Sequence, residues 1–128
     1  MAAKVYHGYF TVREVHDGDT IYGDLDQGLD SWHHNLGLRV AGINARELAD
    51  PGGKEARDNL ASLVHVGDVF PIASFRWDKY ANRIDASVTL PDGRTLATVL
   101  IAAQWAAAWD GRGRKEDHVP PWPRTITP

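Results

Sequence analysis

The chain has 128 residues and contains no cysteine, so disulfide bridges and thiolate metal sites are excluded. No apolar run approaches the length of a membrane span, and the first eight residues hold no apolar core of signal-peptide length. From these absences we expect an intracellular, cytoplasmic protein. Basic residues are not in excess, because 17 Asp and Glu stand against 14 Lys and Arg, for a formal net charge of −3. This charge argues against nucleic-acid binding by bulk electrostatics, but it does not exclude a local basic groove.

Apolar residues make up 43% of the chain, which also contains five tryptophans. Such a composition is typical of a globular protein and not of a disordered or fibrous one. The length fits a single domain that closes one hydrophobic core. Composition therefore predicts one globular domain.

Five segments have the aromatic, β-branched or alternating apolar residues that are typical of strands. They cover residues 9–15, 20–25, 36–41, 69–75 and 84–90. Pro71 suggests an edge position or a bulge in the fourth of these strands. Asp17-Gly18-Asp19 is a turn sequence, and the polar residues 26–35 are expected to form a long loop.

Two further segments predict helices. Residues 54–65 place four apolar side chains on one face at i, i+4, i+7 and i+8, starting from Ala56, and Gly67 ends this amphipathic helix. Residues 96–107 are rich in alanine and predict a second helix. From Gly111 onward, glycine and proline exclude a helix, so we expect a tail that lies extended over the body or is frayed.

The predicted order is three strands, a helix, two strands and a helix. A five-stranded antiparallel set with a helix after the third strand matches a mainly β fold with added α-helices. Specifically, it matches a small closed Greek-key barrel of the oligonucleotide/oligosaccharide-binding (OB) type with two packed helices. An unspecified α+β domain fits the periodicity nearly as well. We place the barrel domain at residues 1–110 and a Pro-rich C-terminal tail at residues 111–128.

Three stretches carry polar residues that folding alone does not require. The first is the turn Asp17-Gly18-Asp19-Thr20, the second is Arg39 together with Asn44 and Glu47, and the third is residues 77–83. Each stretch by itself has an ordinary structural explanation, as a turn, a solvated strand edge or a hairpin loop.

Taken together and in this order, the three stretches resemble the staphylococcal nuclease (thermonuclease) family. The resemblance extends over roughly residues 12–107. It rests on four motifs in register, V-x-x-V-H-D-G-D-T-I, L-R-V-A-G-I-N-A-R-E, G-G-K-E-A-R-x-x-L and D-K-Y-A-N-R-I-D-A-S-V. It implies the OB-type barrel with helices packed against it. It also implies calcium-dependent hydrolysis of phosphodiester bonds in DNA, and in RNA as a second substrate, with little sequence specificity.

The resemblance also implies a calcium site. Asp19 corresponds to the family's first metal carboxylate, Asn44 stands where the family has a second metal-binding Asp, and the backbone carbonyl of Ala45 corresponds to a further ligand. Oxygen ligands are what a hard divalent cation prefers. An Asn oxygen can still bind calcium, but one negative charge is lost. We therefore expect weaker metal binding, a changed metal preference or no activity.

The same resemblance assigns the catalytic and substrate-binding residues. Glu47 corresponds to the acid that positions and activates the attacking water, and Arg39 and Arg83 correspond to the two arginines that hold the phosphate. Lys79 and Tyr80 correspond to the pair that contacts a terminal phosphate and its nucleotide. These residue types suit the reaction, because a carboxylate can activate water and guanidinium groups meet developing phosphate charge with paired hydrogen bonds.

The chain departs from the family pattern in three more places. The loop before Arg83 has one more residue than the family's usual Tyr-Gly-Arg, Arg46 replaces a proline before the acid, and the tail stands in place of a third helix. A basic cluster in this tail, Arg112, Arg114 and Lys115, would extend a phosphate groove, but the two acidic residues directly after it argue against that use.

Other residues that often mark function have plain explanations here. No histidine pair has the helical spacing of a zinc site, and His33 and His34 are expected in the long loop. Trp105 and Trp109 are expected on the second helix, as core residues or as stacking surfaces for nucleotides.

Two hypotheses of different classes remain open. The first is a metal-dependent nuclease, favoured because Asp19, Arg39, Glu47 and Arg83 are all present. The alternative is a catalytically impaired barrel module that binds nucleic acid or a protein partner, favoured by Asn44, the net negative charge and the altered substrate loop.

Overall fold

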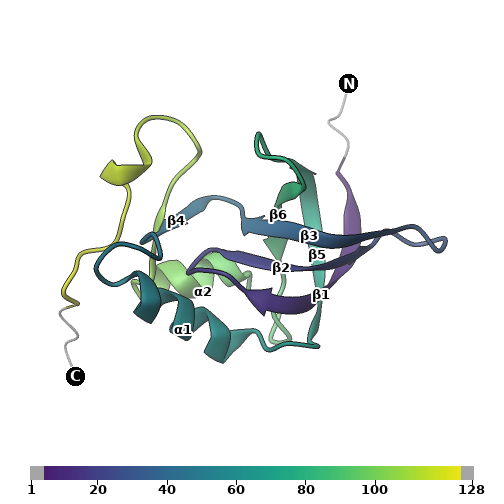
Figure 1. Cartoon of the computed structure of the whole chain (residues 1–128), viewed down its shortest axis with the longest axis horizontal. Coiled ribbons are helices and arrows are strands. Elements are labelled where there is room, and N and C mark those ends of the chain that lie inside the picture. The colour runs from purple at the N-terminus through teal and green to yellow at the C-terminus, as the bar shows by residue number, and fades with distance from the viewer. Residues whose placement is uncertain (1–4, 125–128) are drawn as a thin grey trace.

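Five long strands close into one barrel in a computed structural model that describes residues 5–124 (Figure 1). The order around the barrel is β1-β2-β3-β6-β5. The strands are β1 (His7–Val15), β2 (Thr20–Asp26), β3 (Trp32–Val40), β5 (Val69–Trp77) and β6 (Arg83–Val88). The predicted mainly β fold with a five-stranded barrel and two helices is thereby confirmed, and the architecture is consistent with an OB-fold.

The barrel is mixed, so the expectation of an all-antiparallel set is wrong in one pair. β3 and β6 run parallel, with Leu38 opposite Ile84, while the other four neighbouring pairs are antiparallel. The reason is geometric: strand directions cannot alternate all the way around a closed ring of five. The parallel pair requires the long connection through α1 that lies between β3 and β5.

Inward-facing residues of all five strands form a single core. The alternation predicted for residues 84–90 is confirmed, since Ile84, Ala86 and Val88 are buried. Members of the core from the other strands include Phe10, Val12, Ile21, Leu36, Leu38, Val40, Phe70 and Ile72. Pro71 does not lie at an edge, because the closed barrel pairs it with Tyr9, and the irregularity of β5 falls between Ala73 and Arg76 instead.

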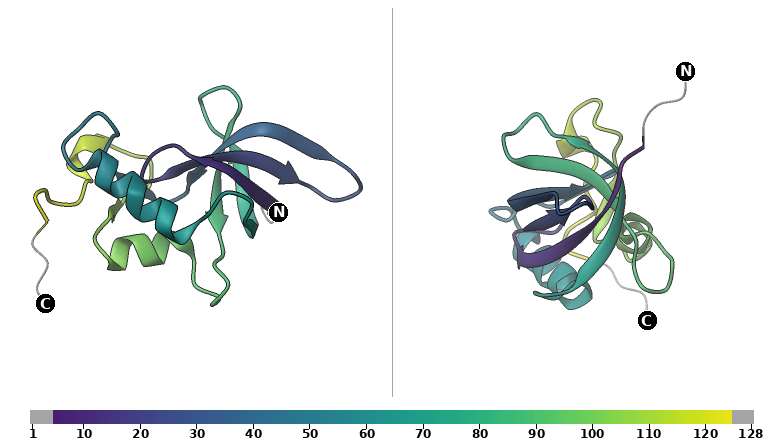
Figure 2. Two further views of the ribbon diagram at one scale, coloured as in Figure 1. Left: turned by 60° about the horizontal axis from the view of Figure 1, so that its bottom comes forward. Right: turned by 90° about the vertical axis from the view of Figure 1, so that its right-hand side faces the viewer.

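The predicted loop over residues 26–35 is wrong in its second half. β3 begins at Trp32, which pairs with Asp26, and the reversal is confined to residues 27–31, where Leu29 and Asp30 adopt positive φ angles of 54° and 58°. The β2–β3 hairpin projects beyond the body of the barrel (Figures 1 and 2). The first four residues of β3 are exposed, so no face of this segment is selected for apolar residues, and the alternation that marks a strand is missing.

The first helix, α1 (Gly53–Leu63), agrees with the prediction and buries Ala56 and Leu60. The second helix, α2 (Leu96–Ala102), is shorter than the predicted 96–107. The chain turns at Gln104 and continues as β7 (Ala106–Ala108), which pairs with β4 (Ile43–Ala45) in a small second sheet. Pairing with a distant strand has overridden the helix propensity of alanine here, so Trp105 and Trp109 are not helical.

The tail lies against the body of the protein as far as Arg124 and includes a short 3-10 helix, η1 (Lys115–Asp117). It passes beside β4 and the start of α1 (Figure 1). The prediction of a tail extended over the body is confirmed for this part, and residues 125–128 lie outside the described range. Within residues 5–124, no helix is both long enough and apolar enough to cross a membrane.

Candidate functional site

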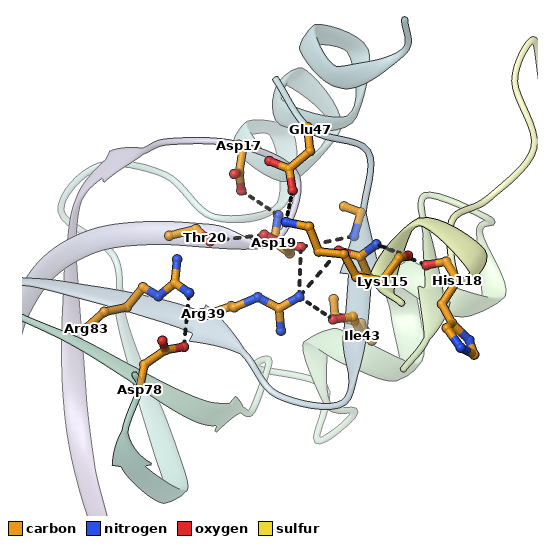
Figure 3. Close-up of polar contacts among 12 residues, drawn as sticks. Asp17, Asp19, Thr20, Arg39, Ile43, Glu47, Asp78, Arg83, Lys115 and His118 are labelled. Carbon is orange, nitrogen blue, oxygen red and sulfur yellow. Dashed lines mark hydrogen bonds and ion pairs between the residues drawn. The ribbon is translucent and has the colours of Figure 1, made fainter. Parts of the chain in front are cut away.

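Three segments meet at one end of the barrel because Gly18 leaves room for them. A Cβ atom at Gly18 would lie 2.8 Å from the Cβ atoms of both Ala45 and Ala56. The turn between β1 and β2 therefore packs directly against β4 and α1. This contact places the carboxylate of Asp19 beside the chain that follows β3 (Figure 3).

The carboxylate of Asp19 is buried and both of its oxygens are engaged. Oδ1 accepts a hydrogen bond from the Thr20 hydroxyl, and Oδ2 accepts one from the backbone N–H of Ala45, both at 3.0 Å. The Nη2 atom of Arg39 lies 3.5 Å from the same Oδ2. Asp19 is thus a fixed anion at the centre of the cluster, and its contact with Ala45 is through the N–H.

Arg39 is held from several sides, and its side chain is only 15% exposed. Its Nη2 donates to the carbonyl oxygen of Ile43 at 2.9 Å and to Oδ1 of Asn44 at 3.4 Å. The guanidinium also lies over the ring of Trp109, 5.3 Å from its centroid. Within residues 5–124 only Nη2 of this group makes hydrogen bonds, so Nε and Nη1 are available to a ligand.

Arg83 lies on the same face as Arg39, on the neighbouring parallel strand. Arg83 pairs with Gly37, and two residues further along Asp85 pairs with Arg39. Since side chains two residues apart share one face of a strand, the two arginines lie next to each other along the β3–β6 seam (Figure 3). Gly37 provides the space, because a Cβ atom there would lie 3.2 Å from Cγ of Arg83.

The Arg83 guanidinium is oriented by a carboxylate and an aromatic ring. Nη2 donates to Asp78 at 3.1 Å, and the group lies 4.7 Å from the centroid of the Tyr80 ring. Its Nε is buried and has no hydrogen-bond partner within the described residues. A buried donor without a partner is costly, so this N–H is suited to an incoming acceptor.

Asp78 and Asp85 both lie near Arg83, and their pKa values are shifted in opposite directions. Burial raises the pKa of Asp85 to about 6, and the neighbouring Asp78 adds to this shift. Burial also pushes the pKa of Asp78 upward, but hydrogen bonds from Asp85, the Tyr80 N–H and Arg83 outweigh it, so that pKa is lowered. Asp78 is therefore the charged partner that fixes Arg83.

Lys79 and Tyr80, the predicted substrate-binding pair, are exposed at the tip of the β5–β6 loop. The Lys79 ammonium lies 5.3 Å from the centroid of the Tyr80 ring. Because Arg83 contacts the same ring, this loop presents two cationic groups around one exposed aromatic surface. Such a surface is suited to a nucleotide base and its phosphate.

Glu47 is paired with a residue that was not among the predicted site residues. Its side chain is 48% exposed and accepts a hydrogen bond from the ammonium of Lys115, whose side chain is 42% exposed. This hydrogen bond raises the pKa of Lys115, and the negative charge of Asp19 contributes to the same shift. The only sequence signal for Lys115 was its place in the basic cluster of the tail.

Asn44 uses its amide group to hold the tail. Its Nδ2 donates to the carbonyl oxygens of Lys115 at 3.0 Å and His118 at 3.1 Å, while Oδ1 accepts from Arg39. The residue is 2% exposed. Asn44, which the sequence predicts as a metal ligand, thus directs its N–H donors at the tail and its side-chain oxygen at the guanidinium of Arg39.

Two more contacts fix the tail, which we call the C-terminal strap (residues 111–124). Nε of Arg46, the residue that replaces a proline of the family pattern, donates to the carbonyl oxygen of Pro120 at 3.0 Å. Arg124 donates to the carbonyl oxygens of Ala103 and Gln104, and its guanidinium lies 3.6 Å from the centroid of the Trp105 ring. The strap is therefore anchored at Lys115 and His118 and again at two points further along the chain.

Asp17 is a further member of the cluster, although the sequence assigned it no role beyond its place in the polar turn. Its Oδ1 accepts the backbone N–H of Asp19 at 3.0 Å. Burial raises the pKa of Asp17 to about 7, and the nearby negative charge of Asp19 adds to the shift. Its place in the Asp-Gly-Asp turn was visible in the sequence, but the crowding of carboxylates that shifts it was not.

The structure therefore brings together most of the predicted residues. Asp19, Arg39 and Glu47 lie together with Arg83 beside them (Figure 3). Asn44 and Ala45 contact this cluster through Arg39 and Asp19, and the Lys79–Tyr80 loop adjoins Arg83. The predicted positions of His33 and His34 are wrong, since both lie on the exposed part of β3.

As arranged, these residues do not fit a calcium site. The Asn44 oxygen faces Arg39, both Asp19 oxygens already accept hydrogen bonds, and the Glu47 carboxylate is paired with an ammonium group. A cation from the chain itself occupies this cluster of carboxylates. Over residues 5–124, no three His, Asp or Glu side chains are grouped so as to hold one metal ion.

A separate hollow of about 200 Å³ is lined by Tyr6, Leu25, Gln27, His33, Phe75, Arg76, Trp77 and Ile84. None of the candidate site residues lines it.

Comparison with known proteins adds no identification: no protein-family model matches the chain, and no curated protein matches it.

Proposed function

We propose that the chain hydrolyses phosphodiester bonds of DNA or RNA with little sequence specificity. The observation that carries the proposal is the convergence of a fixed carboxylate, a half-exposed carboxylate and two oriented guanidinium groups at one end of the barrel. Two neighbouring arginines with unused N–H donors suit a phosphate, which offers acceptor oxygens in several directions.

In this mechanism Arg39 and Arg83 bind the non-bridging oxygens of the scissile phosphate. Glu47 takes a proton from water as the water oxygen bonds to phosphorus. The bond from phosphorus to the sugar oxygen breaks, and this oxygen leaves with the electron pair and takes a proton from solvent water. The guanidinium groups stabilise the charge that gathers on the equatorial oxygens. Asp19 positions Arg39. No step uses calcium, because the residues as arranged do not fit that ion.

Low sequence specificity follows from the kind of contacts available. Arg39 and Arg83 would contact phosphate, and Tyr80 would stack on any base, so none of them distinguishes base edges. The proposed partner is therefore a DNA or RNA strand.

One observation favours the second candidate, a catalytically impaired barrel module that binds nucleic acid or a protein. Lys115 neutralises the carboxylate that would act as the base, and Asn44 is committed to the strap. In such a module the arginines and the Lys79–Tyr80 loop would bind a phosphate backbone without cleaving it.

A cleavage assay separates the two candidates. Purified protein is incubated with supercoiled plasmid, single-stranded DNA and RNA, each with calcium, magnesium, manganese or EDTA. The proposed hydrolase nicks plasmid and shortens the single strands in at least one condition. Failure to cut in any condition, with Asn44→Asp and Lys115→Met also inactive, would leave only the binding module.

A further inference from the structure

Lys115 places a cationic group among the carboxylates of the candidate site. It reaches from the C-terminal strap into the cluster and pairs with Glu47 (Figure 3). The ammonium is also close enough to Asp19 and Arg39 for both charges to act on it. The carboxylates of Asp19 and Glu47, with Asp17 beside them, then face the cationic groups of Lys115 and Arg39.

The position of Lys115 is built into the fold. The backbone of Lys115 itself is bound by Asn44, a residue that is 2% exposed, and the strap is tied again at Pro120 and Arg124. Two carbonyl oxygens point at Asn44, and its amide NH2 group can donate to both of them, whereas a carboxylate has no N–H to donate. An aspartate at this position could bind a metal but could not hold the strap.

We infer that Lys115 is the resident cation of this site and that it excludes a divalent metal ion from Asp19 and Glu47. The same contact engages Glu47, the proposed base, so Lys115 restrains the proposed hydrolase as well. The inference rests on the proposed function for what the site does, but competition between Lys115 and a metal ion can be measured without cleavage.

The test compares metal affinity among three strap variants of the full chain. Lys115→Met removes the charge, Lys115→Arg keeps it, and Arg114→Met is the matched control. Arg114→Met makes the same charge change on the same strap, but Arg114 faces Glu116, 3.8 Å away, and both side chains are well exposed. Terbium luminescence excited through tryptophan is a suitable readout, because Trp109 packs on Arg39 beside the site. Calcium affinity then follows by competition and by titration calorimetry.

We expect Lys115→Met to bind terbium and calcium about tenfold or more tightly than the parent, because removal of a competing charge leaves two carboxylates for the ion. Arg114→Met should stay within about twofold of the parent, the range that a charge at an exposed, screened position allows. Lys115→Arg should stay within the same range because it keeps the competing cation. Circular dichroism confirms that each variant is folded. Equal affinity in Lys115→Met and Arg114→Met would overturn the inference, as would a Lys115→Arg variant that binds as tightly as Lys115→Met.

Parallel cleavage assays keep this inference separate from the proposed function. If Lys115→Met binds calcium tightly but no variant cuts any nucleic acid, competition by Lys115 stands and the hydrolase falls. If the parent cuts and Lys115→Met gains no metal affinity, the hydrolase stands and the inference falls.

Discussion

Replacement of Asn44 by Asp tests the central contact of the site, because it exchanges a strap anchor for a metal ligand. The substitution removes both N–H donors, at 3.0 and 3.1 Å, and leaves a carboxylate facing two backbone carbonyl oxygens in a buried place. A net hydrogen bond contributes about 0.5–1.5 kcal/mol, so the loss of two predicts a decrease of roughly 1–3 kcal/mol in the free energy of unfolding. For a domain of this size that corresponds to a Tm lower by roughly 3–15 °C.

The assay is urea and thermal unfolding of parent and Asn44→Asp at pH 7 in EDTA, followed by the same measurement in calcium. Asn82→Asp is the matched control, since it makes the same charge change at an exposed turn residue that also donates one amide hydrogen bond, to Asn35. We expect Asn44→Asp to lose stability in EDTA, to become more sensitive to trypsin at Arg112 and Arg114, and to recover stability when calcium binds.

Two results would refute this reasoning in different ways. Equal stability of parent and Asn44→Asp in EDTA would show that the amide does not hold the strap. Calorimetry that finds no tighter calcium binding in Asn44→Asp would show that position 44 is not a metal-ligand position in this chain.

Three further predictions concern the base, the turn carboxylate and the turn glycine. Glu47→Gln should slow cleavage by about 10²–10⁴-fold in a plasmid-nicking assay and leave the Tm almost unchanged, because it removes proton transfer and only an exposed ion pair; cleavage at the parent rate would exclude Glu47 as the base. The pKa of Asp17 is about 7 in the folded protein, against an ordinary value of 3.8 for an aspartate in an unfolded chain. The folded protein therefore holds this proton more tightly, and the stability that the bound proton contributes is lost as the pH rises from about 4 to about 7. Asp17→Asn keeps the acceptor for the Asp19 N–H but cannot titrate, so urea unfolding between pH 4 and 8 should show a smaller decline in stability than in the parent; an identical decline would contradict the shift. Gly18→Ala places a Cβ atom 2.8 Å from two others and should cost about 1–3 kcal/mol in chemical denaturation; an unchanged midpoint would mean that the turn can move away.

Local sequence patterns were sufficient for most of the barrel and for the first helix. Ile84, Ala86 and Val88 alternate because one face of β6 is buried, and Ala56 and Leu60 share a helical face for the same reason. The same rule explains the errors. The first residues of β3 bury neither face, and Ala106–Ala108 form a strand only because β4 lies beside them.

The candidate residues, too, could be named from the sequence, since Asp19, Arg39, Glu47 and Arg83 stand in recognisable motifs. Their mutual arrangement needed the barrel. The two arginines become neighbours only through the parallel pairing of β3 with β6, and Asp19 reaches Ala45 only because Gly18 has no side chain.

The sequence by itself determined the barrel, its core and which polar side chains merited attention. Only the tertiary structure decided what those side chains do to one another. Glu47 and Lys115 are 68 residues apart in the chain, and Asn44 is 71 and 74 residues from its two acceptors. No periodicity or turn signal encodes contacts across such separations, because they depend on the path of a tail that has only the short helix η1 among its described residues. Asn44 therefore looked like a weakened metal ligand in the sequence, whereas the fold makes it the anchor that brings a lysine to the carboxylates.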